Sequence, residues 1–162
     1  MTEITRRDIT TISGVALAAG ACGLANADDR AGQTPGGERM NIERYGLTQA
    51  IADTPIISLM TVHDDIVHLC GVSADPGSPS DVKDQTRQVL ERIDLLLGRA
   101  GTSKSKLISA TVWLTDMAHF ADHNAVWNAW VDPKNPPVRA CLHSPQLWRP
   151  GLLVEIMATA AR

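Results

Sequence analysis

The sequence has few aromatic residues, few cysteines and no excess of positive charge. Aromatic side chains make up 4% of its 162 residues, and the formal net charge is -3. No region forms a basic stripe with interleaved aromatic residues, so nucleic acid is not predicted as a partner. The three cysteines, Cys22, Cys70 and Cys141, match no zinc motif and no disulfide framework. The length suffices for one domain with a hydrophobic core.

A long apolar run is also missing. The uncharged stretch 12–24 is too short and too rich in glycine and alanine to cross a membrane as a helix, so no stable membrane insertion is predicted. It follows the pair Arg6-Arg7 and precedes Ala25-Asn26-Ala27, which offers an A-x-A cleavage site. This order is typical of a twin-arginine export signal over residues 1–27 and predicts a periplasmic protein.

The segment that follows the signal, 28–39, is polar and rich in glycine and proline, and it is predicted to be a linker. The folded domain is then expected to cover residues 40–162. Met40 opens this domain, and translation that started there would give a cytoplasmic protein instead. The sequence therefore predicts export and leaves the internal start as the alternative.

Within the domain, the hydrophobic spacing predicts the order β-β-β-α-β-α-β-β. Alternating or apolar runs predict strands over 40–46, 55–62, 66–73 and 107–114, and two more within 136–158. Apolar residues at helical spacing predict helices over 81–100, capped by Ser80 or Asp81, and over 118–131. The fold class is therefore α+β, a six-stranded mixed sheet with two helices on one face.

The residues with chemical potential are concentrated in 136–158, where two alternating runs flank a turn and predict a hairpin. If the aliphatic faces of both runs pack on the core, Arg139 and Glu155 emerge together on the far side. A guanidinium beside a carboxylate suits holding an anionic substrate and moving a proton. The alternative is a cross-strand ion pair on a solvated sheet.

The run P-V-R-A-C at 137–141, followed by V-E-I at 154–156, resembles the signature of the RidA (YjgF) family, and the layout is closest to its YoaB-type branch. The resemblance implies a chorismate-mutase-like fold and a barrel-like homotrimer with ligand pockets between subunits. It also implies hydrolysis of enamines and 2-imino acids to keto acids and ammonia, with no cofactor and no metal.

By the same resemblance, Arg139 binds the substrate carboxylate and Glu155 positions or activates water. Substrate-binding positions of the family fall on the residues Cys70, Gly71, Asn124 and Cys141. Two departures concern chemistry: Cys70 stands in place of a serine, and the family tyrosine has no counterpart, because Tyr45 lies too far upstream. A third is the bulky loop 147–150 between Arg139 and Glu155.

Two readings of function follow. The chain is either an imine-hydrolysing enzyme or a non-catalytic trimer that binds small carboxylates or acts as a chaperone. Arg149 in the bulky loop is either a second anion-binding group or a solvated loop residue. His119 and His123 have the spacing of a two-histidine metal pair, but no third ligand is evident, so a surface pair is predicted.

Overall fold

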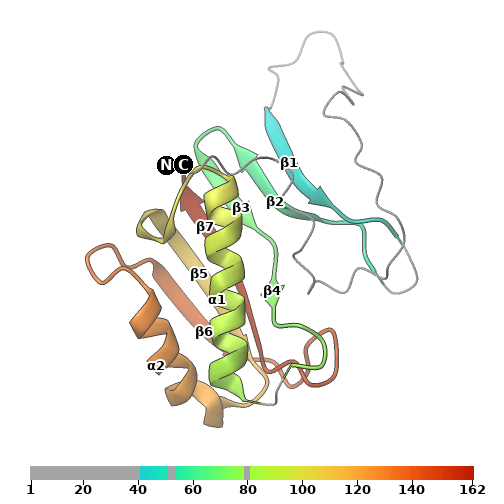
Figure 1. The fold of residues 1–162 in the computed structure, drawn as a ribbon, viewed down its shortest axis with the longest axis vertical. Coiled ribbons are helices and arrows are strands. Elements are labelled where there is room, and N and C mark those ends of the chain that lie inside the picture. The colour runs from blue at the N-terminus through green and yellow to red at the C-terminus, as the bar shows by residue number, and fades with distance from the viewer. Residues whose placement is uncertain (1–40, 51–53, 79–80) are drawn as a thin grey trace, which may run out of the picture.

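The protein folds as one mixed β-sheet with two helices on the same face (Figure 1). The computed structural model describes residues 41–50, 54–78 and 81–162. The predicted signal 1–27, the linker 28–39 and Ser80 lie outside these residues. The strands are β1 (Ile42–Leu47), β2 (Ser58–His63), β3 (Ile66–Leu69), β4 (Val72–Ser73), β5 (Leu107–Leu114), β6 (Val138–His143) and β7 (Val154–Ala161). The helices are α1 (Val82–Arg99) and α2 (Phe120–Trp130), with short 3-10 turns at Lys104–Lys106 and Met117–His119.

The predicted α+β class with two helices on one face of a mixed sheet is confirmed, but the predicted C-terminal hairpin is wrong. The sheet order is β1-β2-β3-β7-β5-β6, so β5 lies between β6 and β7. Strand β6 runs parallel to β5 because α2 connects them as a crossover, and β7 then returns antiparallel on the other side of β5. The turn-rich segment 144–153 spans β5 instead of closing a hairpin.

The strand predicted over 66–73 is interrupted at Cys70-Gly71. Strand β3 ends at Leu69, and the short strand β4 then pairs with β7, placing Ser73 opposite Glu155. The interruption accounts for the seventh strand, where six were predicted. It also brings the backbone of Gly71 against the side chain of Glu155.

Helix α1 begins where the sequence predicts. The Asp81 carboxylate accepts hydrogen bonds from the backbone N–H groups of Lys83 and Asp84, which satisfies donors that the first turn leaves free. Its buried face includes two polar residues, Gln85 and Thr86, each fully inaccessible. The Gln85 amide donates to the Gly151 carbonyl at 2.8 Å and accepts from the Leu153 N–H at 2.8 Å. A core residue of α1 therefore holds the end of the loop that leads into β7.

Helix α2 packs beside α1 on the sheet (Figure 1). Trp127 is buried, and the Trp130 indole donates to the Asp94 carboxylate of α1 at 2.8 Å. Phe120, the first residue of α2, is 41% exposed. The apolar contact of α2 with the core is therefore made by its C-terminal half.

The opposite face of the sheet has no helix over it in the described part of the chain (Figure 1). Several apolar side chains on or beside this face are exposed, including Val138 and Leu142 of β6 and Met157 of β7. Strand β6 also ends the sheet and presents an unpaired edge. None of the helices of the described residues is long and apolar enough to span a membrane.

Candidate active site

Arg139 lies on the helix-covered side of the sheet. Its partner in the register with β5 is Ala110, which is buried in the core, and its guanidinium carbon lies 4.8 Å from the centre of the Trp127 ring in α2. Neighbouring residues in register share a face, so Val138 and Leu142 take the other side. The prediction that they pack on the core is wrong: they are 72% and 45% exposed.

Glu155 lies on the uncovered side of the sheet. Its neighbours in β7, Val154 and Ile156, are fully buried under the helices, as the alternation predicted. Arg139 and Glu155 therefore do not emerge together from one copy. They occupy opposite faces and are separated by β5. Alternation shows which residues of a strand share a face, but it does not show which face an edge strand buries.

A first group of side chains, the Arg139 cluster, consists of Arg139, Cys141, His123, Asn124 and Trp127. Cys141 follows Arg139 on the same face of β6, since its register partner Val112 is fully buried. Asn124 lies one turn before Trp127 in α2. The Nε and Nη2 atoms of Arg139 and the Oδ1 atom of Asn124 are buried and have no hydrogen-bond partner among the described residues.

Such unpaired buried donors are costly, because they have lost water without gaining an acceptor. Burial lowers the pKa of the Arg139 guanidinium from its ordinary value, but the group stays cationic at neutral pH. The same burial raises the pKa of the Cys141 thiol, and the nearby charge of Arg139 opposes that rise. The cluster thus presents a cation with free donors, suited to an anionic ligand such as a carboxylate.

His123 belongs to this cluster and was not predicted as a site residue. It is fully buried, not part of a surface pair, and its Nδ1 atom lies 3.1 Å from the Thr86 hydroxyl. That hydroxyl donates to the Val82 carbonyl, so it accepts from His123, whose Nδ1 must carry the proton. The Nε2 atom is then a bare acceptor, buried without a partner among the described residues. Burial, with a contribution from the charge of Arg139, lowers the pKa of His123 to about 4.

The stability of the fold should therefore depend on His123 in acid. Its pKa is 6.5 in an ordinary setting and about 4 in the folded protein, so between these values the unfolded state binds more protons and acid favours it. We expect His123 alone to reduce the free energy of unfolding by about 3 kcal/mol between about pH 7 and about pH 4. Denaturant unfolding of the protein and of a His123→Gln variant across this range measures the effect.

The Gln side chain can still donate to Thr86 and binds no proton, so the difference between the two pH profiles isolates His123. Other titrating groups contribute to both proteins alike. Parallel profiles for the two proteins would contradict a buried neutral imidazole.

A second group, the Glu155 cluster, lies on the uncovered side and consists of Glu155, Cys70, Gly71, Ser73 and Trp148. A Cβ atom at Gly71 would stand 2.1 Å from Oε1 of Glu155, so only glycine leaves room for this carboxylate. The Trp148 indole donates to the Ser73 hydroxyl at 3.0 Å, which fixes the loop next to β4. Burial raises the pKa of Glu155, and burial with the charge of Glu155 raises the pKa of the Cys70 thiol.

A half-buried carboxyl with a raised pKa is protonated more readily than an exposed one, which suits a group that takes up and releases a proton. The six site residues predicted from the sequence thus fall into two clusters. Arg139, Asn124 and Cys141 lie on the helix-covered side, and Glu155, Cys70 and Gly71 lie on the other side. Two further residues belong to the clusters: His123 to the first and Trp148 to the second.

Comparison with known proteins identifies the family. The model for the family described as Endoribonuclease L-PSP matches residues 49–162. A RutC family protein of Haemophilus ducreyi is 36% identical over 104 residues, which cover 64% of this chain and 87% of that protein. The RutC family protein YoaB of Escherichia coli is 34% identical over 102 residues, or 63% of this chain and 87% of YoaB. The chain belongs to this family, known as RidA or YjgF.

Solved structures agree with the fold. A member of the YjgF protein family from Neisseria meningitidis superimposes with a TM-score of 0.68 at 32% identity, covering 77% of this chain and 98% of that one.

A protein of Escherichia coli named as a reactive intermediate deaminase, TdcF, is 35% identical over 86 residues, 52% of this chain and 66% of TdcF. The family contains proteins named for deamination beside many that carry only a family name.

Proposed function

We propose that this protein hydrolyses enamines and 2-imino acids to keto acids and ammonia, in pockets formed between copies of the chain. The observation that carries the proposal is the state of Arg139, whose two buried guanidinium nitrogens have no partner among the described residues. A 2-imino acid carries a carboxylate that fits such a group in a bidentate manner. The deaminase name of TdcF supports the reaction class.

The chemistry needs one nucleophile and two proton transfers. Water adds to the imine carbon, the carbon–nitrogen double bond becomes a single bond, and the resulting carbinolamine expels ammonia to leave the keto acid. Glu155, whose pKa burial raises, would accept a proton from the attacking water and return it to the departing nitrogen. Arg139 would hold the carboxylate so that the imine carbon faces the water.

One copy cannot supply both groups to one small substrate. Strands in a sheet lie about 4.8 Å apart, so β6 and β7 are separated by roughly 10 Å, and Arg139 and Glu155 also point to opposite faces. A second copy that packs against the edge of β6 and the uncovered face would bring the two clusters together. The exposed Val138, Leu142 and Met157 give that contact an apolar surface. We propose that this assembly is the homotrimer that the family resemblance implies.

The full-length protein should accelerate the release of keto acid and ammonia from 2-imino acids formed in situ by an amino-acid oxidase. We expect a rate that is proportional to protein concentration and exceeds the spontaneous hydrolysis measured without the protein. Assembly is checked on the same sample by light scattering. A well-formed oligomer without turnover of any 2-imino acid would contradict the enzymatic proposal.

That result would favour the second candidate, a non-catalytic binder of small carboxylates. The missing tyrosine supports this candidate, because Tyr45 lies on the edge strand β1 and its hydroxyl donates to Glu43, away from either cluster. In this second candidate function, Arg139 still binds the carboxylate of the ligand, and Glu155 transfers no proton.

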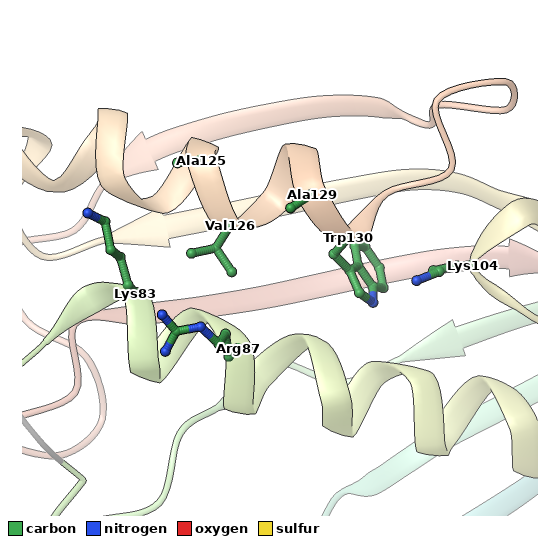
Figure 2. A pocket seen from close by; sticks show the side chains of 7 residues that line it. All are labelled: Lys83, Arg87, Lys104, Ala125, Val126, Ala129 and Trp130. Carbon is green, nitrogen blue, oxygen red and sulfur yellow. The ribbon is translucent and has the colours of Figure 1, made fainter.

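RNA cleavage, which the description of the family model names, has less support. The groove between α1 and α2 carries three cationic side chains, Lys83, Arg87 and Lys104, over an apolar floor (Figure 2). Lys83 is paired with Asp122 and Arg87 with Asp84, so two of the three charges are already compensated. The net charge of -3 adds no attraction for phosphates.

A further inference from the structure

The loop between β6 and β7 carries a second arginine with an uncompensated charge. None of the ion pairs found within residues 41–50, 54–78 and 81–162 involves Arg149. Its guanidinium carbon lies 4.8 Å from the centre of the Trp148 ring, and its Nε atom is buried without a hydrogen-bond partner in that part of the chain. Arg149 therefore resembles Arg139, which also stacks on an indole and also has buried N–H groups to offer.

The position of Arg149 follows from the contacts of its neighbour. The Trp148 indole donates to the Ser73 hydroxyl at 3.0 Å, and Ser73 pairs in register with Glu155. Residues paired in this way share a face of the sheet, so the loop lies beside the Glu155 cluster. Two hydrogen bonds to Gln85 hold the end of the loop, through Gly151 and Leu153. These contacts fix the loop on both sides of Arg149.

Arg149 does not serve as the counter-ion of Glu155. The pKa of Glu155 is raised by burial, with no opposing effect of a neighbouring cation, whereas an ion pair would lower it. The positive charge of Arg149 is therefore still available to a ligand. Arg149 stacks on Trp148 of the Glu155 cluster, so a pocket that joins the two clusters would have Arg139 on one side and Arg149 at its border.

We propose that the pocket is selective for dicarboxylic ligands, and that the preferred substrates are 2-imino acids with a second carboxylate at the far end. This inference rests on the proposed function for the reaction and deepens it by naming the substrate class. Arg139 takes the carboxylate next to the imine carbon, and Arg149 takes the distal one. Arg149 has no part in the covalent step, which remains the addition of water and the loss of ammonia.

The size of the effect follows from the strength of a charge-assisted hydrogen bond. The Nε atom of Arg149 is buried and unpaired among the described residues; a ligand with one carboxylate leaves this arginine without an acceptor, whereas a dicarboxylate supplies one. A charge-assisted hydrogen bond of this kind contributes about 1.5–3 kcal/mol. The expected preference for the dicarboxylate is therefore about 10-fold to 100-fold in affinity.

The test compares ligands of equal carbon count in the full-length protein. Calorimetry gives the affinities of succinate against butyrate and of glutarate against valerate. The ratio is then measured in Arg149→Gln and in the control Arg44→Gln. Arg44 is an exposed arginine of β1 whose hydrogen bond within the described residues goes to Ile42 of its own strand. We expect a dicarboxylate preference of at least about 10-fold that Arg149→Gln abolishes and Arg44→Gln retains.

Equal affinities in the unmodified protein, or a preference that survives in Arg149→Gln, would overturn the inference. The same ratio measured as kcat/KM on 2-imino acids with and without a distal carboxylate extends the test to turnover. If no turnover is seen with any substrate, only the hydrolysis proposal is contradicted. The ratio of binding affinities still decides whether Arg149 binds a second carboxylate.

Discussion

Replacing Arg139 by alanine is expected to reduce kcat/KM for 2-imino acids by about 100-fold or more while the fold persists. Loss of one partner of a desolvated charge pair costs about 2–5 kcal/mol, and no other cation of the described residues lies in the Arg139 cluster. Arg139→Lys should be impaired as well, because lysine keeps the charge but neither the bidentate geometry nor the stacking on Trp127. Circular dichroism and light scattering verify that both variants fold and assemble.

The same variant can show that the site joins two copies. Mixed at equal amounts with Glu155→Gln, which is expected to be inactive by itself, Arg139→Ala should regain activity after the subunits exchange. In about a quarter of the pockets, Arg139 then comes from a Glu155→Gln copy and Glu155 comes from an Arg139→Ala copy. A mixture that stays as inactive as its components would mean that both groups act within one chain, or that neither acts.

Gly71→Ala is expected to lower kcat by about 100-fold or more with little loss of stability. An added Cβ would stand 2.1 Å from Oε1 of Glu155 and 2.9 Å from its carboxyl carbon, so the carboxylate has to move away. General acid–base groups contribute about 100-fold to 10,000-fold and act only within hydrogen-bond reach of the reacting atoms. The end of a glutamate side chain shifts easily, so the fold absorbs the change.

Gly98→Ala is the matched control, because a Cβ at Gly98 in α1 has no neighbour within 4 Å. It should keep full turnover and gain roughly 0.5–1 kcal/mol of stability from the lower entropy of the unfolded chain. Steady-state kinetics and thermal unfolding of the two variants separate the effect on Glu155 from the effect of a methyl group. Undiminished turnover in Gly71→Ala would remove Glu155 from the mechanism.

Local pattern was enough to find most elements of this fold. Helix α1 follows from its apolar spacing and the Asp81 cap, and β5 has the predicted bounds. These features depend on residues close in sequence. The hairpin prediction failed because Pro and Gly mark a turn without showing how far the chain travels through it. Only the pairing of β5 with both β6 and β7 reveals that the segment 144–153 crosses a strand.

The site was predicted by residue identity more than by geometry. The family resemblance identified Arg139 and Glu155 as site residues. The alternation of side chains along the two strands, taken without their pairing, wrongly predicted that both lie on one face of the sheet. The prediction fails at the edge strand β6, because its aliphatic residues face the uncovered side and its arginine faces the helices. His123 escaped notice because a buried histidine depends on a partner distant in sequence, Thr86. Its spacing of four residues from Trp127 was the available signal.

The contact between Gln85 and the ends of the segment 151–153 separates the integrity of the sheet from the sequence of the loop. Because a core residue of α1 bonds Gly151 and Leu153, and because the Ser144 N–H bonds the Leu114 carbonyl at the other end, both ends of the connection are fixed to the scaffold. Residues 145–150 lie between these fixed points. Exchanges among them that keep the bond from Trp148 to Ser73 leave the fixed points in place. Under the proposed function, ligand preference can therefore change while the sheet that carries Glu155 stays the same.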